Sequence, residues 1–316
     1  MKNKERAIYL SLFAMLLWGS AIPVVKLTYL ELMIGEGDIG NKILLAGIRF
    51  FISGLITLIY FVIFDKGIKK NNKVNWKFIL FLGAIQTSVQ YIFYYIGLSN
   101  TFGINSSIIQ ASNSFLVCVF SAILIPQDKI NSKIIISLII GTIGIIVTNS
   151  SRGQMISMGN FNGDGFIFIA TSINALCTIL VRKYAADQNA YILNGFQFLF
   201  GSILLLLIGF NISGDNLNLS IKGIILIVYS GFISATAFTI WTLIIQMYSA
   251  SEFGIYKLFV PIFGSILSVI FLGENFTVRL AVGLICVLVS SVILNFKKGY
   301  FSKNKNSSLY EHENLL

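Results

Sequence analysis

The sequence contains few of the residues on which catalysis in soluble enzymes depends. Only 11% of its 316 residues are charged, and it has a single histidine, His312. Its three cysteines, Cys118, Cys177 and Cys286, lack the spacing of a metal site or a redox pair. No Ser-His-Asp set, paired-carboxylate site or phosphate-binding loop can be assembled. We therefore expect no enzyme, no catalytic residue, no metal site and no cofactor.

Long apolar runs make up most of the chain. Hydrophobic residues make up 56% of the chain, and the mean hydropathy is +0.82, whereas soluble proteins carry about 25% charged residues. The runs are continuously apolar, which favours helices of about 20 residues over barrel strands. The sequence predicts an all-α integral membrane protein, and the first run is interpreted as a span, not a cleaved signal peptide. The predicted spans are 8–27, 41–64, 76–98, 103–125, 132–149, 163–183, 190–210, 221–247, 251–272 and 276–295.

The net charge of +10 has a one-sided distribution. Most of the 23 lysines and arginines fall at the N-terminus, in residues 65–77 and 128–133, around Arg182 and in the C-terminal tail. Cations retained on the cytoplasmic side set the orientation of membrane proteins. We expect a multi-pass protein of the plasma membrane with both termini in the cytoplasm, and no nucleic-acid partner.

Two halves of the chain share one pattern. Four matches occur in the same order: Trp18–Lys26 with Asn174–Arg182, Arg49–Gly54 with Gln197–Ser202, Thr101–Asn105 with Glu252–Tyr256, and Gln127–Lys133 with Gly273–Arg279. Because each copy would hold five spans, the second copy would enter the membrane from the opposite side. The predicted domains are two inverted five-helix repeats, residues 1–149 and 150–296, and then a disordered cytoplasmic tail, residues 297–316.

Several of these segments carry a family resemblance. Trp18-Gly19-Ser20, Arg49-Phe50, Pro261–Ser265 and the run ending in Phe271-Leu272-Gly273-Glu274 resemble the EamA family of the drug/metabolite transporter superfamily. The resemblance covers residues 5–296. It implies ten helices, an inverted repeat and efflux of metabolites or drugs, often amino acids, without fixing the substrate.

Polar and aromatic side chains inside the spans indicate where a solute would bind. Gln86, Gln90 and Tyr94 recur every four residues, on one helical face. Such groups are costly to bury unpaired and mark pathways, although they also join neighbouring membrane helices, and both interpretations remain open. The uncharged candidates for solute binding are Trp18, Gln86, Gln90, Tyr94, Gln110, Asn113, Asn174, Gln197 and Trp241.

Charges within the spans are few. Arg49 and Lys257 are placed deep enough to bind a solute carboxylate or, alternatively, to brace the helices. All 13 carboxylates fall in predicted loops or at helix ends. Because proton-coupled carriers commonly use a buried Asp or Glu as a relay, we expect facilitated transport or exchange instead of proton coupling.

The leading hypothesis is a carrier that exports small organic solutes, such as amino acids or related metabolites, by alternating access. Its partners would be a small-molecule solute and the lipid bilayer, and a homodimer is left open. A sugar-phosphate or nucleotide-sugar exchanger is the first alternative, although it would need more clustered cations. A membrane enzyme, or a receptor or scaffold, is the alternative from another class.

Overall fold

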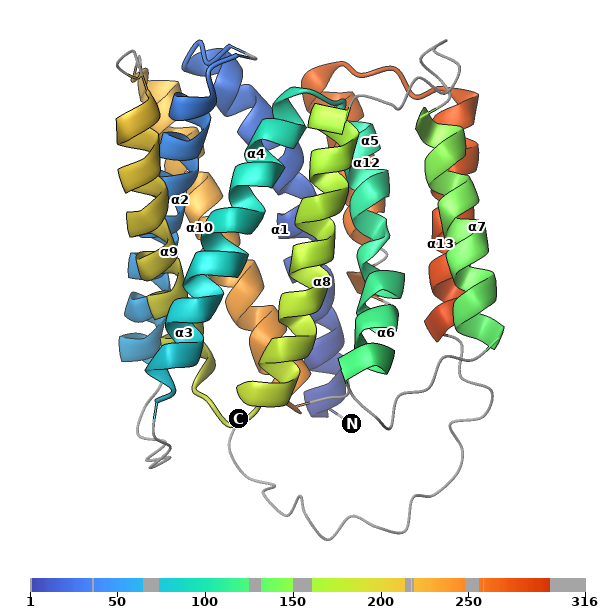
Figure 1. The fold of residues 1–316 in the computed structure, drawn as a ribbon, viewed down its shortest axis with the longest axis horizontal. Helices are drawn as coiled ribbons and strands as arrows, with labels where there is room; N and C mark the ends of the chain where they lie inside the picture. Colours follow the sequence, from blue (N-terminus) through green and yellow to red (C-terminus); the bar gives the residue numbers. More distant parts are fainter. Residues whose placement is uncertain are drawn as a thin grey trace, which may run out of the picture.

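The computed structural model describes residues 2–35, 37–64, 74–124, 132–149, 161–213, 217, 219–247, 256–257 and 259–295, and these form a bundle of helices (Figure 1). The first half contains α1 (Lys2–Glu31), α2 (Ile39–Phe64), α3 (Trp76–Leu82), η1 (Gly83–Val89), α4 (Gln90–Ser99), α5 (Gly103–Ala111), α6 (Asn113–Leu124) and α7 (Ser132–Asn149). The second half contains η3 (Phe161–Gly165), α8 (Phe166–Tyr184), α9 (Ala190–Ile212), α10 (Ile221–Met247), α12 (Phe259–Leu272) and α13 (Val278–Asn295). The predicted tail lies outside the described residues.

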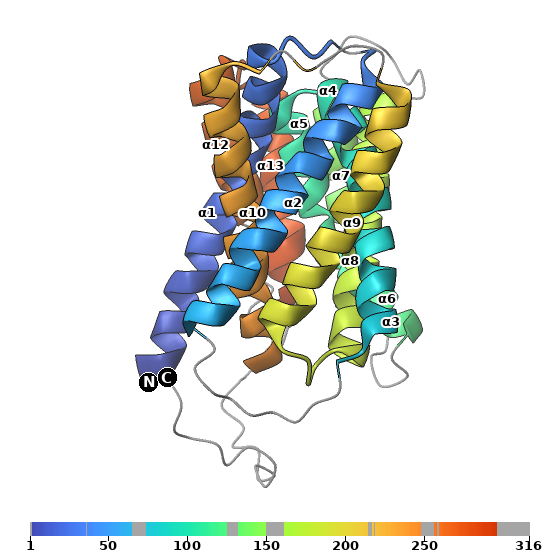
Figure 2. The ribbon, with the colours of Figure 1, turned by 90° about the vertical axis from the view of Figure 1, so that its left-hand side faces the viewer.

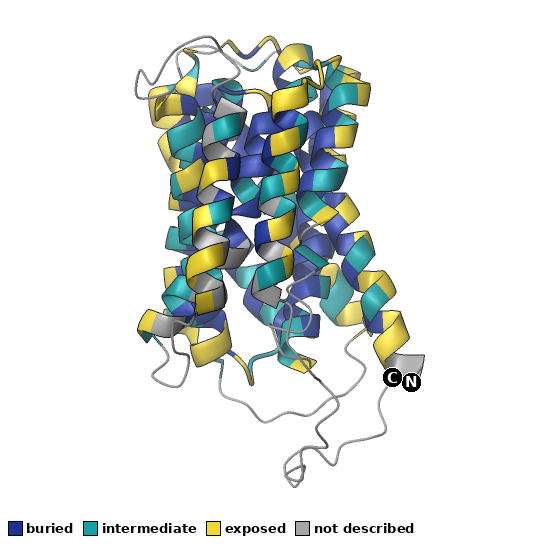
Figure 3. Cartoon of the chain, turned by 90° about the vertical axis from the view of Figure 1, so that its right-hand side faces the viewer, coloured by how far each residue is buried: buried dark blue, intermediate teal, exposed yellow. Residues whose placement is uncertain are grey.

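Within the part of the chain that the structure describes, six helical stretches are long and apolar enough to cross a membrane: Lys4–Glu31, Ile39–Phe64, Trp76–Ser99, Phe161–Tyr184, Ala190–Ile212 and Ile221–Met247. Their outward faces carry large apolar side chains such as Val62, Phe210 and Ile225, which are more than 60% exposed. Exposed residues line the outside of the helices, while buried ones fill the interior (Figure 3). Such a surface suits lipid as the surrounding solvent, and the chain is an all-helical membrane protein.

The helices of the two halves pack reciprocally. α2 lies along α9 on one side of the bundle, and α7 lies along α13 on the other (Figures 1 and 2). α1 packs on α10 and α12, and its counterpart α8 packs on α4, α5 and α6. α1 and α8 run in opposite directions (Figure 1). The C-terminal part of α1 contacts α4, where Tyr29 Oη donates to the Tyr95 carbonyl at 2.9 Å. η3, from which α8 continues, packs on the same helix α4, so α8 starts at the end of the bundle where α1 finishes.

The predicted span 76–98 is helical throughout but not regular. Residues Gly83–Val89 form a π-helix, so the N–H of Gln90 donates to the carbonyl of Ile85, five residues back. Ser88 Oγ lies 3.1 Å from the carbonyl oxygen of Gly83 and 3.0 Å from that of Gly201 on α9. A Cβ at Gly201 would collide with Thr87 and the Gly83 carbonyl. The π-helix therefore lies close against α9 at Gly201, and the Ser88 hydroxyl bonds to both helices at this point.

The predicted span 103–125 is two helices. α5 ends at Ala111 and α6 begins at Asn113, with the N–H of Ser112 donating to the Ile109 carbonyl, three residues back. The first turn of α5 is capped from the other half of the chain, because Glu274 accepts from the N–H groups of Gly103 and Ile104 at 2.7 and 2.9 Å.

The ninth predicted span also differs. Tyr256 and Lys257 form a short 3₁₀ turn, and α12 begins at Phe259; residues 251–255 lie outside the described part. Lys257 therefore precedes α12 instead of lying two turns inside a helix. Pro261 lies in the first turn of α12, where its missing N–H costs little. α1, by contrast, continues through Pro23.

Candidate functional site

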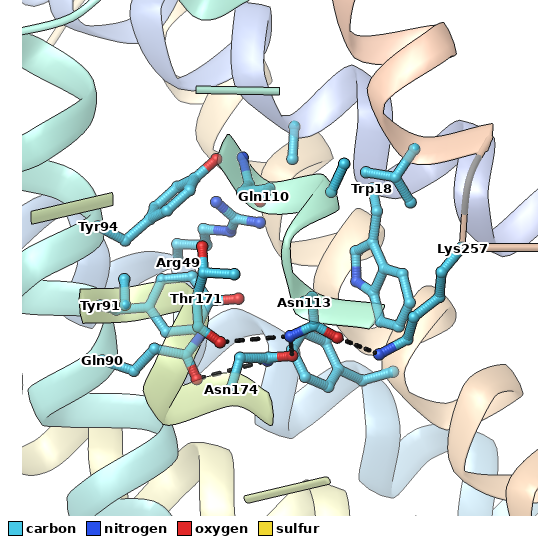
Figure 4. Close-up of a pocket in the computed structure, with 15 residues that line it drawn as sticks. Trp18, Arg49, Gln90, Tyr91, Tyr94, Gln110, Asn113, Thr171, Asn174 and Lys257 are labelled. Carbon is cyan, nitrogen blue, oxygen red and sulfur yellow. Dashed lines mark hydrogen bonds between the residues drawn. The ribbon is translucent and has the colours of Figure 1, made fainter. Parts of the chain in front are cut away.

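A cavity of about 100 Å³ lies between the helices where α5 gives way to α6. Its wall comes from α1, α2, α4, α8 and α10, from the two ends that meet at Ser112, and from the segment around Lys257 (Figure 4). Eight of the residues predicted from the sequence line it: Trp18, Arg49, Gln90, Tyr94, Gln110, Asn113, Asn174 and Lys257. A helix interrupted at membrane depth is tolerated where it lines a cavity, and here the interruption places Gln110 and Asn113 on that wall.

A smaller cavity of about 30 Å³ adjoins the first and shares Trp18, Asn174, Phe238 and Lys257 with it. Gln86 and Trp241, both predicted from the sequence, line this second space. Gln86 Oε1 and Trp241 Nε1 are buried and have no hydrogen-bond partner within the described part of the chain. Buried polar atoms are normally satisfied, so these two mark a place where a solute or water atom would bind.

Gln197 lines neither cavity. Its side chain is 1% exposed, and its Nε2 donates to Asn194 Oδ1 on the same helix at 3.1 Å. Asn194 in turn donates to Thr242 Oγ1 on α10 at 3.0 Å. Gln197 therefore supports, from within α9, the polar contact that Asn194 makes with α10.

Arg49 both braces the bundle and lines the cavity. Its Nε and Nη2 atoms donate to Ser234 Oγ on α10 at 3.0 and 2.8 Å, and Nη1 donates to Tyr95 Oη at 3.3 Å. The guanidinium carbon lies 5.4 and 5.9 Å from the ring centres of Phe50 and Tyr91. No carboxylate of the described residues pairs with this buried cation, so its charge is held by neutral dipoles and aromatic faces.

Lys257 is the second cation of the cavity. Its Nζ donates to Asn113 Oδ1 at 2.9 Å and lies 4.8 Å from the ring centre of Trp241 and 5.9 Å from that of Trp18. As with Arg49, it has no carboxylate partner among the residues that the structure describes. The ammonium group is therefore held by one amide and two rings.

Amide side chains continue from Lys257 across the cavity (Figure 4). Asn113 Nδ2 donates to Asn174 Oδ1 at 3.1 Å and to the Thr171 carbonyl at 3.3 Å. Asn174 Nδ2 then approaches Gln90 Oε1 at 3.5 Å. We call these three residues, Asn113, Asn174 and Gln90, the amide chain. It joins α6, α8 and α4 around one space.

Seven lining residues were not singled out from the sequence: the larger or polar Tyr91, Thr171 and Phe238, and the small or apolar Ala21, Ala111, Ala170 and Val260. Phe238 stands edge-on to Trp18 with ring centres 5.3 Å apart, and Trp241 meets the same indole at 6.0 Å. Phe238 precedes Trp241 by three residues and so shares its helical face, which is the signal that would have found it. Thr171 contributes its backbone carbonyl, for which the sequence gives no signal.

Comparison with known proteins gives a consistent result. A family model described as the EamA-like transporter family matches residues 5–150 and 161–296. An uncharacterized transporter of Clostridium kluyveri is 23% identical over 266 residues, covering 82% of this chain and 83% of that protein. The uncharacterized transporter YetK of Bacillus subtilis is 24% identical over 306 residues, covering 94% and 89%. One crystal structure superposes with a TM-score of 0.68 at 15% identity, over 92% of this chain and 97% of the other; that likeness concerns the fold.

Proposed function

Because the chain belongs to the EamA-like transporter family, we propose that it carries small organic solutes across the membrane by alternating access, with the solute bound in the cavity of Figure 4. Membership makes the chain a multi-pass membrane transporter in a family without enzymatic activity. The observation that carries the proposal is the interrupted α5–α6 segment, which borders a cavity lined by amides, aromatic rings and two cations. Binding at a broken helix inside the bundle is a recurrent design of secondary transporters.

The architecture that goes with this function is ten spans in two inverted repeats, residues 1–149 and 150–296, with both termini in the cytoplasm. The reciprocal packing of α1 and α8, and their opposite directions, support it. Alternating access would then result from the second repeat tilting against the first around the cavity. We propose that transport is outward, and that the solute belongs to the broad class of amino acids, related metabolites and drugs, within which the charge of the solute is considered below.

Single-cysteine labelling tests the orientation. In a background without Cys118, Cys177 and Cys286, a membrane-impermeant maleimide applied to intact cells should label Gly35→Cys, in the connection between α1 and α2, and should spare Ser307→Cys in the tail. The reverse pattern, or labelling of both, would contradict the proposed orientation of the repeats.

Transport itself is tested in proteoliposomes. We expect a library of amino acids, their metabolites, organic acids and aromatic drugs to contain transported solutes. For these, uptake of the labelled solute should rise when the same unlabelled solute is loaded inside the liposomes. Gln90→Ala and Trp241→Ala should each reduce that exchange by about tenfold or more, because each removes a group that faces the solute. If no member of the library moves, the transporter assignment at this cavity fails; if both variants behave like wild type, the cavity is not the binding site.

A sugar-phosphate exchanger is the second candidate, since Arg49 and Lys257 line the same cavity. Phosphate recognition by arginine uses two parallel N–H groups on one edge of the guanidinium. In this protein the Nε–Nη2 edge of Arg49 is already directed at Ser234 Oγ. The geometry therefore favours a solute with a less demanding anionic group.

A further inference from the structure

The hydrogen bonds that link the amide chain all run from donor to acceptor in one direction, away from Lys257, and Lys257 determines that direction. An ammonium group can only donate hydrogen bonds, so Asn113 must turn its oxygen toward Lys257 and its nitrogen away. That nitrogen requires an acceptor, which fixes the oxygen of Asn174 toward Asn113; the nitrogen of Asn174 then faces the oxygen of Gln90. The orientation of amides is otherwise ambiguous, and here one cation determines it along the whole chain.

The consequence is an excess of donors around the cavity. The oxygens of Asn113, Asn174 and Gln90 each accept a hydrogen bond within the chain. The Gln90 amide nitrogen and the remaining N–H groups of Lys257 have no acceptor among the described residues. Gln110 is a counter-example, since its nitrogen donates back to Ser106 and leaves its oxygen as an acceptor. Within the described part of the chain, the unpartnered Gln86 oxygen of the adjoining cavity is balanced by the unpartnered N–H of Trp241.

The charge balance points the same way. Two cations line the cavity, and among the described residues no carboxylate does. Closing a cavity around unpaired charge is unfavourable once water is removed, unless the ligand supplies the opposite charge. An ammonium group entering this space would meet two like charges and find neutral acceptors, whereas a carboxylate would meet N–H donors and two positive charges.

We propose that the transported solute is an organic acid with a net negative charge, whose carboxylate binds to Lys257 and to the free amide donors of the cavity. This inference rests on the proposed transport function and narrows its substrate class. Amines and zwitterionic amino acids would be poor ligands in comparison with the matching acids. Phosphate esters carry about two negative charges and would need Arg49 in addition to Lys257. Because Ser234 occupies the Nε–Nη2 edge of Arg49, we expect phosphate esters to bind less well than carboxylates, for which Lys257 and the amide donors suffice.

Matched ligands that differ only in charge test the proposal. Purified protein in nanodiscs would be titrated with 3-phenylpropanoate, phenylalanine, 2-phenylethylamine and 2-phenylethyl phosphate, and with 4-methylpentanoate, leucine and 3-methylbutylamine, using the shift of the unfolding temperature. At least one carboxylate should bind about tenfold more tightly than its amine and its amino acid. Equal or tighter binding of the amine, the amino acid or the phosphate ester would overturn the proposal, and so would the absence of binding by both carboxylates.

Variants assign the preference to Lys257. Lys257→Gln should weaken the carboxylate by about tenfold and leave the amine unchanged or better bound, whereas Lys257→Arg should retain the preference. Asn113→Asp places a carboxylate against the ammonium and should likewise abolish the preference for acids. The matched control is Lys222→Gln, which removes an exposed cation at the start of α10. Unaltered selectivity in Lys257→Gln and Asn113→Asp, with both proteins folded, would overturn the assignment.

The proteoliposome assay distinguishes an error in the proposed charge selection from an error in the proposed transport function. If proteoliposomes exchange neutral or cationic solutes and reject the acids, transport stands and the charge selection is wrong. If they exchange nothing in the library, the function itself fails.

Discussion

Glu274 accepts a hydrogen bond from the backbone N–H of Gly103 at 2.7 Å, so a carboxylate just beyond α12 caps the first turn of α5. Its second oxygen takes the N–H of Ile104, and Lys26 of α1 lies 3.9 Å away. The first N–H groups of a helix have no partner within the helix, and a negative charge there also favours the helix dipole. One side chain thus joins α1, α5 and the α12–α13 connection.

Removing this cap should destabilise the protein. Glu274→Ala is expected to cost about 1–2 kcal/mol, because two N–H groups lose a charged acceptor, and Glu274→Gln should cost less because one oxygen remains. The unfolding temperature of the purified protein measures both. Glu5→Ala, an exposed carboxylate in the first turn of α1, is the control; it removes only a screened interaction with the helix dipole and should lower that temperature by less. An equal effect of both alanine variants would refute the capping role.

Ser234 should matter because it holds Arg49. Its hydroxyl accepts from two nitrogens of the guanidinium and is fully buried. Ser234→Ala would leave those donors unpaired at a cost of about 1.5–3 kcal/mol, measurable as a lower unfolding temperature. Ser172→Ala removes a hydroxyl that bonds only within its own helix α8 and should be close to neutral. A stable Ser234→Ala protein would show that Arg49 has another way to be satisfied.

The contact between the π-helix and α9 predicts a strict requirement for glycine at position 201. A methyl group there would meet Thr87 and the Gly83 carbonyl, and such overpacking costs about 1–3 kcal/mol. Gly201→Ala should therefore unfold at lower temperature, whereas Gly35→Ala, where an added Cβ meets nothing within 4 Å, should not. The two variants are compared in the same detergent.

Gln90 and Gln197 should respond differently to the same replacement. Gln90→Met removes an amide that faces the cavity, and exchange in proteoliposomes should fall. Gln197→Met replaces a buried amide whose oxygen has no partner in the described part of the chain, so transport should persist with little change in stability. Loss of transport in Gln197→Met at normal stability would return this residue to the binding site.

Coupling to protons is expected to be absent. The carboxylates of the described residues lie near helix ends and connections, as Glu31, Asp164 and Glu274 do, and not beside the cavity. An imposed pH gradient across proteoliposomes should therefore not accumulate a non-titrating solute above equilibrium. Uphill accumulation that collapses with an ionophore would disprove this expectation.

Much of this molecule can be predicted from hydropathy and spacing. Apolar runs located the long helices, and polar residues within them located most of the cavity wall, because both depend on the cost of burying polar groups in lipid. Gln197 lies outside both cavities, and the sequence could not anticipate this because a cavity and an interhelical bond require the same residue type. The break at Ser112 has no proline or glycine beside it, so only tertiary packing reveals it.

The wide turn between Gly83 and Val89 has one more consequence. A π-helix is an α-helix that holds one extra residue per hydrogen-bonded ring, so it shifts the angular register of α3 against that of α4. Gln86 faces the smaller cavity and Gln90 the larger, although four residues separate them on one nominal stripe. If the extra residue moved along the helix, side chains would rotate about the helix axis from one cavity toward the other. Both ends of the span would stay in place, and the helix would not need to bend.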